Sequence, residues 1–169
     1  TAYSRTLARP SFKEKSAASI FDPITERRFI GNLDLEQTYI QNADLRWEYF
    51  FQPGEMVSVS GFFKGFKDPI EIVTYDALST DNFTPRNVGS ATVYGVEFET
   101  RKNFAFIAPS LRNLNFATNV SVIKSEVERS EQEYEAALIT AASGEEVSRT
   151  REMQGQSPYI VNATLNYNS

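Results

Sequence analysis

The stretch SPYIVNATLNY, residues Ser157 to Tyr167, alternates strictly between two kinds of side chain. One parity carries apolar residues and ends in tyrosines, whereas the other carries small neutral polar residues such as Asn162 and Thr164. Strict alternation over this length is the period of a β-strand whose two faces differ. The stretch therefore predicts a strand with one apolar face and one polar face, and the nature of the fold depends on what lies against each.

Several other parts of the chain repeat this pattern. The Pro-Gly turn signal QPGE, Gln52 to Glu55, separates two of them and predicts a hairpin with a very short connection. The opening segment up to LARP also has the character of a strand. Together with the final stretch, this predicts six antiparallel strands, the four central ones at residues 43–51, 56–66, 92–102 and 114–125.

The connections between these strands alternate between long and short. A loop of roughly thirty residues follows the first strand, where no alternation persists. A polar loop with one short edge strand is predicted near residues 73–91, after the third strand. The acidic stretch 125–152 follows the fifth strand and is rich in helix formers, so a short helix is expected there. Connections after the second and fourth strands are short, so all long loops fall at one end of the strands.

Composition excludes several classes of function. The 169 residues are enough for one domain, and 13 Phe and 8 Tyr make the chain too aromatic for a disordered segment. A net charge of −5 gives little electrostatic support for a nucleic-acid partner. The sequence contains no Cys and no His, which removes disulfides, thiolate metal sites and the commonest general base. No enzyme activity, catalytic residue, cofactor or metal site is predicted.

Two architectures produce alternating antiparallel strands of this kind. A soluble sandwich buries its apolar faces in a dry core, whereas a transmembrane barrel turns them toward lipid and lines its lumen with polar residues. Long strands, long loops confined to one end, and aromatic residues near the strand ends favour the barrel. The aromatic residues in question are Trp47, Tyr49, Phe51, Tyr159 and Tyr167. A soluble β-sandwich that binds carbohydrate or protein at the cell surface is the alternative.

Four blocks, taken in order, resemble a known family. They are YSRTLARPSFKE, GNLDLEQTYIQNADLRWEYFFQPGEMVSVSGFFKGFKDPIE, NVGSATVYGVEFETRKNF and GQSPYIVNATLNY. The set resembles the C-terminal barrel region of TonB-dependent outer-membrane receptors, in particular the Bacteroidetes type. It covers most of the chain, and the acidic loop at 128–150 is the least recognisable part.

The resemblance implies a parent protein with a barrel of roughly 22 strands and an N-terminal plug domain. Such a receptor in the outer membrane of a Gram-negative bacterium takes up a scarce ligand, such as a siderophore, cobalamin or a glycan. TonB supplies the energy by acting on the plug. The partners implied are outer-membrane lipid, the TonB system through the plug, a small-molecule or glycan ligand, and a surface lipoprotein.

The sequence is expected to be one part of that parent. It opens within a strand, without an initiator methionine or signal peptide, and it contains no plug and no terminal aromatic strand. Residues 1–169 are therefore interpreted as a single partial domain, a section of barrel wall with its loops. Six strands cannot close a barrel of that size, so the isolated sheet is expected to self-associate through its open edges.

Acidic residues offer candidate sites, each with a simpler explanation. Glu97 and Glu99 share one strand face, as do Asp44 and Glu48, and paired carboxylates can perform acid–base chemistry. Arginines on the same faces favour a solvated polar surface with charges of both signs. The stretch NLDLEQ and the acidic loop could hold a hard cation such as calcium, but no EF-hand spacing is present.

Aromatic residues in the loops are the candidates for ligand contact. Tyr75 and Phe83 lie in the polar stretch after the third strand, and binding residues concentrate on loops. A sugar ring would stack well on either aromatic face. Packing of the loop on itself is the simpler explanation for both, so the sequence leaves the ligand and its contacts open.

Overall fold

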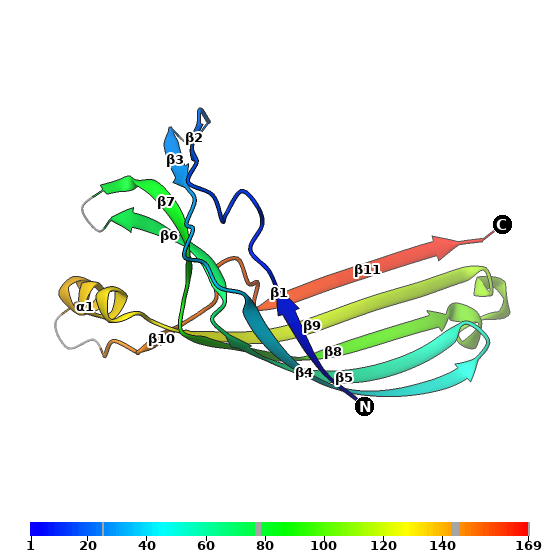
Figure 1. Cartoon of the computed structure of the whole chain (residues 1–169). Coiled ribbons are helices and arrows are strands. Elements are labelled where there is room, and N and C mark those ends of the chain that lie inside the picture. The colour runs from blue at the N-terminus through cyan, green and yellow to red at the C-terminus, as the bar shows by residue number, and fades with distance from the viewer. Residues whose placement is uncertain (25, 77–78, 143–145, 169) are drawn as a thin grey trace.

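The chain folds around one long, twisted sheet, and the long connecting segments rise from one end of it (Figure 1). The computed structural model describes residues 1–24, 26–76, 79–142 and 146–168, with the backbone alone at 75, 76, 79–81 and 132. The seven strands of this sheet run in the order β1-β4-β5-β8-β9-β10, and β11 also pairs with β9. Their bounds are Ala2–Ala8 (β1), Thr38–Gln52 (β4), Glu55–Lys67 (β5), Ser90–Asn103 (β8), Leu114–Glu128 (β9), Thr150–Arg151 (β10) and Tyr159–Tyr167 (β11).

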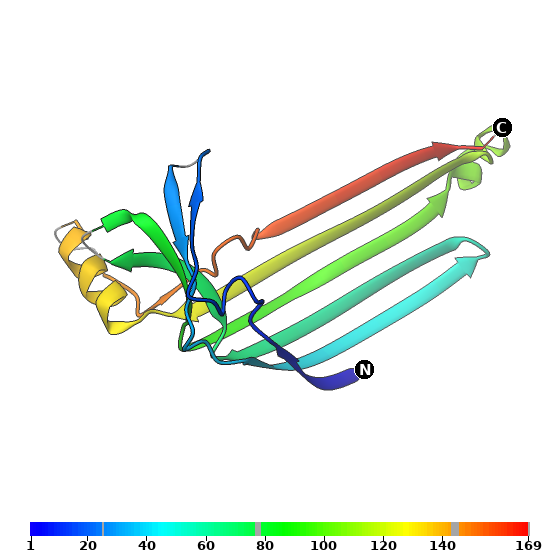
Figure 2. The ribbon, with the colours of Figure 1, turned by 45° about the horizontal axis from the view of Figure 1, so that its top comes forward.

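Every pairing in the long sheet is antiparallel. The six strands predicted from alternation are β1, β4, β5, β8, β9 and β11, so the prediction of an all-β fold with long meander strands is confirmed. β4 and β9 each reach 15 residues, because pairing extends them beyond their alternating segments. The long strands lie side by side without closing on themselves (Figure 2).

One face of the long sheet is apolar and uncovered. The pairing registers place Trp47, Val59, Phe98, Val120 and Val161 in a single row across five strands. Trp47 and Val161 leave 58% and 59% of their surfaces exposed. A sandwich would bury this row under a second sheet. The uncovered face is instead what a wall in contact with lipid presents.

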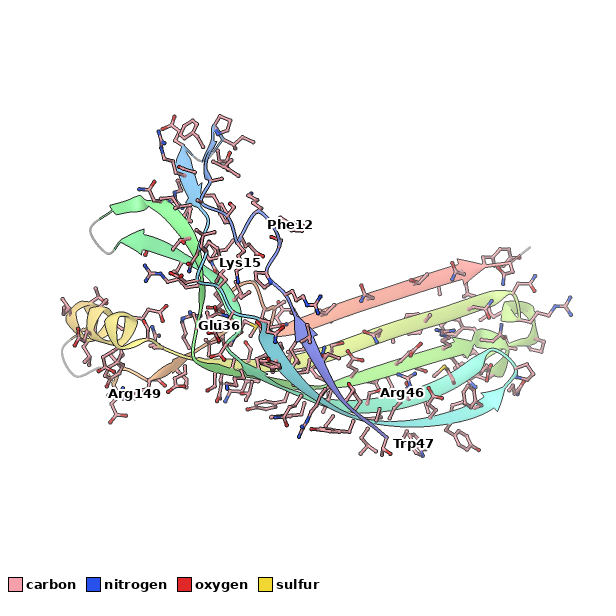
Figure 3. The ribbon with its side chains drawn as sticks, in the orientation of Figure 1. Phe12, Lys15, Glu36, Arg46, Trp47 and Arg149 are labelled. Atoms are coloured by element: carbon pink, nitrogen blue, oxygen red, sulfur yellow. The ribbon has the colours of Figure 1, made fainter. Side chains whose placement is uncertain are left out.

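The opposite face of the same strands is polar. The row next to the apolar one consists of Glu48, Ser58, Glu99, Asn119 and Asn162, again across five strands. Figure 3 shows the alternation directly, because the neighbouring Arg46 and Trp47 leave β4 on opposite sides. The two faces therefore suit two different surroundings, lipid on one side and a polar interior on the other.

The two ends of the long strands differ as well. At one end, a tight turn at Pro53–Gly54 joins β4 to β5. At the same end, two short 3-10 helices join β8 to β9: η1 at Phe104–Phe106 and η2 at Pro109–Leu111. At the other end, long connections carry further structure (Figure 1).

These long connections contain a second sheet that the sequence analysis missed. It has four strands in the order β2-β3-β7-β6, at Ser19–Asp22 (β2), Arg27–Ile30 (β3), Ile70–Asp76 (β6) and Ser79–Asn87 (β7). The expectation of irregular loops with one short edge strand was therefore wrong. The strands were missed because they are short or rich in polar residues, so periodicity does not mark them.

The third long connection begins with the helix α1, at Glu131–Thr140, as its content of helix formers predicted. Ser130 starts it with a capping box, in which its hydroxyl accepts a hydrogen bond from the Glu133 amide and the Glu133 carboxylate accepts one from the Ser130 amide. None of the described helices has the length and apolar character that crossing a bilayer requires.

The buried apolar core is small and lies where the long connections leave the sheet. Val88, Ala91 and Val127 form it, with Phe66 and Met153 packed against them. Through Val88 and Met153, this cluster anchors the second and third connections to the end of the strands. The connections are therefore packed against the end of the sheet, although the rest of the sheet is uncovered.

Candidate functional site

Hydrogen bonds join the first two long connections. β3 from the first connection pairs in parallel with β7 from the second, with Phe29 opposite Phe83. The Asn87 side chain accepts a hydrogen bond from the Glu36 amide (2.8 Å) and donates to the Glu36 carbonyl (3.1 Å). It also donates to the carbonyl of Asp68 at 2.8 Å. One asparagine thus holds segments that lie about fifty residues apart in the chain.

An ion-pair network attaches the third connection to the second. Arg151 on β10 donates from Nη2 to Glu71 Oε2 on β6 at 2.6 Å and to Glu133 Oε1 on α1 at 3.2 Å. Glu71 is almost fully buried. The hydrogen bond that Arg151 donates to Glu71 is the main cause that raises the pKa of Arg151, so the guanidinium stays charged. All three long connections are therefore tied into one assembly.

A cleft of about 880 Å³ lies between this assembly and the polar face of the long sheet. Its floor includes Ile40 and Phe66, which are opposite one another on β4 and β5 and share the parity of the polar face. The upper walls come from β2, β3, β6 and β7, and from residues next to them. The lining residues are Ala8, Arg9, Lys13, Glu14, Ile20, Asp22, Arg27, Arg28, Phe29, Thr38, Ile40, Phe66, Pro69, Ile70, Glu71, Ile72, Phe83, Met153 and Gln154.

Two cations in the cleft wall rest on two neighbouring aromatic rings. Lys13 Nζ lies 4.6 Å from the ring centroid of Phe29, and Arg27 Cζ lies 4.8 Å from that of Phe83. These distances are within the range of cation–π attraction. Because Phe29 and Phe83 face one another across the β3–β7 pair, the four side chains form one group, here called the cation–aromatic cluster.

Of the two aromatic residues predicted for ligand contact, the structure places only the side chain of Phe83. Phe83 lies in the cleft wall and is half-buried beneath Arg27. Tyr75 belongs to the backbone of β6, but its side chain lies outside the described residues. Contact of either residue with a ligand stays a prediction.

Sequence reasoning missed Lys13, Arg27 and Phe29. The adjacent residues RRF at 27–29 were the only local signal, since they combine two arginines with an aromatic ring on a segment without clear alternation. Their functional context depends on the parallel pairing with β7, which joins residues 28–29 to residues 82–83. That contact is invisible in the local sequence.

Two of the carboxylates on the polar face, Glu48 and Glu99, are paired with arginines. Glu99 accepts hydrogen bonds from Arg46 Nη2 and Arg101 Nη2, each at 2.9 Å, and Arg46 also pairs with Glu48. Arg46 reaches the hydroxyl of Ser60 at 3.1 Å. This arrangement is a salt-bridged polar surface of the kind that the charges of both signs indicated. Because Glu99 is paired with two arginines, it is not a free carboxylate that could transfer a proton.

The acidic loop does not assemble ligands for a cation in the described part of the chain. Among those residues, no group of three or more His, Cys, Asp or Glu side chains is placed to hold a metal ion. Glu131 instead pairs with Arg149, and Glu133 pairs with Arg151. The acidic residues of this connection therefore serve in part to cap α1 and to hold the loops.

Comparison with models of protein families gives a match to the chain. No curated protein matches the chain. A family model described as "TonB dependent receptor-like, beta-barrel" matches residues 1–169, which is the whole chain. Receptors and transporters of the bacterial outer membrane make up this family, and the open antiparallel sheet with one apolar and one polar face agrees with a section of such a barrel. The chain belongs to the TonB-dependent receptor-like β-barrel family.

Proposed function

We propose that residues 1–169 form wall and outward-facing loops of a receptor that imports a scarce ligand with energy transmitted by TonB. The ligand would be a siderophore, cobalamin or a glycan. The observation that carries the proposal is the pair of opposed rows across five strands, one apolar and exposed, the other polar and salt-bridged. A wall between lipid and an aqueous lumen requires that pair of faces.

In this proposal the three tied connections lie on the outer surface of the cell. Long connections at one end and short turns at the other are the pattern of outer-membrane barrels, whose longer loops are extracellular. The cleft would then open toward the outside, above the lumen face of the wall. A ligand would enter there first, and a plug domain, acted on by TonB, would release it inward while the wall itself stays passive.

The proposal also covers partners. Lipid would contact the row of Trp47 and Val161, and a surface lipoprotein could dock on the outward loops. β1 pairs with β4 alone and β11 with β9 alone among the described strands, so each leaves one edge for neighbouring strands of the same barrel. The same edges would make the isolated chain self-associate.

The test is fractionation of the source cells, followed by detection with an antibody raised against this chain. We expect a band in the outer membrane that is larger than this chain alone and that changes mobility on boiling. Ligand uptake by these cells should fall when TonB is deleted. A soluble protein, or uptake that is unaffected by loss of TonB and of the receptor, would contradict the proposal.

A further inference from the structure

The charges that line the cleft are not balanced. Its four basic residues, Arg9, Lys13, Arg27 and Arg28, have no ion-pair partner among the described residues. The chain as a whole carries a net charge of −5, so the excess of positive charge in the cleft is opposite in sign to the charge of the whole chain.

The acidic residues of the cleft are already occupied. Glu71 is paired with Arg151 at 2.6 Å. Glu14 accepts a hydrogen bond from the Ser11 amide at 2.7 Å, and Asp22 accepts one from the Ile24 amide at 2.9 Å. Arg151 neutralises Glu71, whereas the backbone amides leave the charges of Glu14 and Asp22 in place, so four basic residues outnumber these two carboxylates in the cleft.

The cation–aromatic cluster combines positive charge with an apolar surface. Lys13 and Arg27 lie over the rings of Phe29 and Phe83, which removes part of their hydration and fixes their heads beside the cleft. Isoleucines and Phe66 extend the apolar surface across the walls and floor. An anion bound here would meet two fixed cations, and an apolar group attached to it would meet rings and aliphatic side chains.

We propose that the cleft binds an organic anion, a ligand with one anionic head and an apolar body. The head would bridge Lys13 and Arg27, and the body would lie against Phe66 and the isoleucines. This inference rests on the proposed function, because it names the ligand class for the same outward-facing cleft. A neutral sugar is the competing ligand, since it would use the aromatic faces without needing the cations.

The experiment uses the complete receptor that contains this chain, purified in detergent, and titration calorimetry. Two probes share one apolar body: 2-naphthalenesulfonate carries a negative charge, and 2-naphthalenemethanol is neutral. Charge-assisted hydrogen bonds to two cations should make the dissociation constant of the sulfonate at least about tenfold lower. The preference should shrink at high salt, because Lys13 and Arg27 are exposed to solvent.

Two variants separate the cluster from the general charge of the loops. Lys13→Gln with Arg27→Gln should abolish the preference for the sulfonate while the neutral probe still binds. Arg149→Gln is the matched control, because Arg149 also lies over an aromatic ring, Tyr134 at 4.4 Å, but outside the cleft. It should leave the preference unchanged.

Three results would overturn the inference. They are equal binding of the two probes, equal loss of preference in the Arg149→Gln control, and binding of a neutral disaccharide such as maltose in place of the sulfonate. Each of them, obtained with a receptor that resides in the outer membrane and imports its ligand through TonB, refutes the ligand class alone. Failure of the fractionation test refutes the proposed function itself.

Discussion

Val161 and Asn162 are neighbours in the sequence, and their side chains belong to different surroundings. Val161 ends the apolar row that begins at Trp47, whereas Asn162 ends the polar row that begins at Glu48. At the scale of the residue, the two faces of the sheet are set by the alternation of Cβ directions along an extended chain. A substitution at Val161 therefore tests whether the apolar face contacts lipid, and the same substitution at Asn162 provides the control on the polar face.

We expect Val161→Arg to destabilise the receptor in a bilayer by about 2–4 kcal/mol, the cost of a basic side chain near the middle of the lipid face. Asn162→Arg should cost far less, because the polar face already holds Arg46 and Arg101. Urea titration in lipid vesicles, followed by the electrophoretic shift of the folded barrel, measures both. Equal costs for the two variants would mean that Val161 does not face lipid.

At the scale of the element, close approach of β5, β8 and β9 depends on a glycine. A Cβ on Gly95 would lie 2.4 Å from the carbonyl oxygen of Val122 on β9 and 2.8 Å from Phe62 Cζ on β5. Phe62 stands directly opposite Gly95 and covers it on the polar face. Gly61, one residue away from Phe62, has nothing within 4 Å of the same position.

Gly95→Ala should therefore destabilise the sheet by about 1–3 kcal/mol, the range for overpacking, because the β9 backbone would have to move. Gly61→Ala is the matched control and should change stability little. The same urea titration compares the two. If neither substitution changed stability, β8 and β9 would be able to separate slightly without cost, and the contact between Gly95 and Val122 would not be a tight one.

At the scale of the whole molecule, the loop assembly is held by contacts between segments distant in the chain. Arg151 joins β10 to Glu71 on β6, eighty residues away, and to Glu133 on α1. Because the Glu71 side chain is only 8% exposed, removing its partner would leave a carboxylate with little access to water. Arg151 therefore links the third connection to the second by ion pairs.

Arg151→Gln should weaken the attachment of the 129–158 connection by about 2–3 kcal/mol, somewhat less than the loss of a fully buried pair, since a fifth of the arginine side chain is exposed. Limited proteolysis of the receptor should then cut this connection faster. Arg149→Gln removes an exposed pair with Glu131 and should have little effect. Equal rates of cleavage in the two variants would mean that Arg151 does not hold the third connection in place.

The sequence by itself determined the long strands, their two faces, the tight turn at Pro53–Gly54 and the helix after Ser130. These features follow from local rules: alternation of side chains along a strand, turn chemistry and a local composition rich in helix formers. The family was also recognisable from the order of its blocks. Phe83 was singled out as a loop aromatic, without any indication of what surrounds it.

Only the tertiary structure decided the loop sheet, the cleft and the cation–aromatic cluster. Each depends on contacts between segments far apart in the chain, such as Phe29 with Phe83 and Glu36 with Asn87. Short or polar strands such as β3 and β7 carry no periodic signal of their own and exist because they pair with each other. The wall could therefore be predicted from local periodicity, whereas the site above it required the fold, since non-local pairing alone brings its residues together.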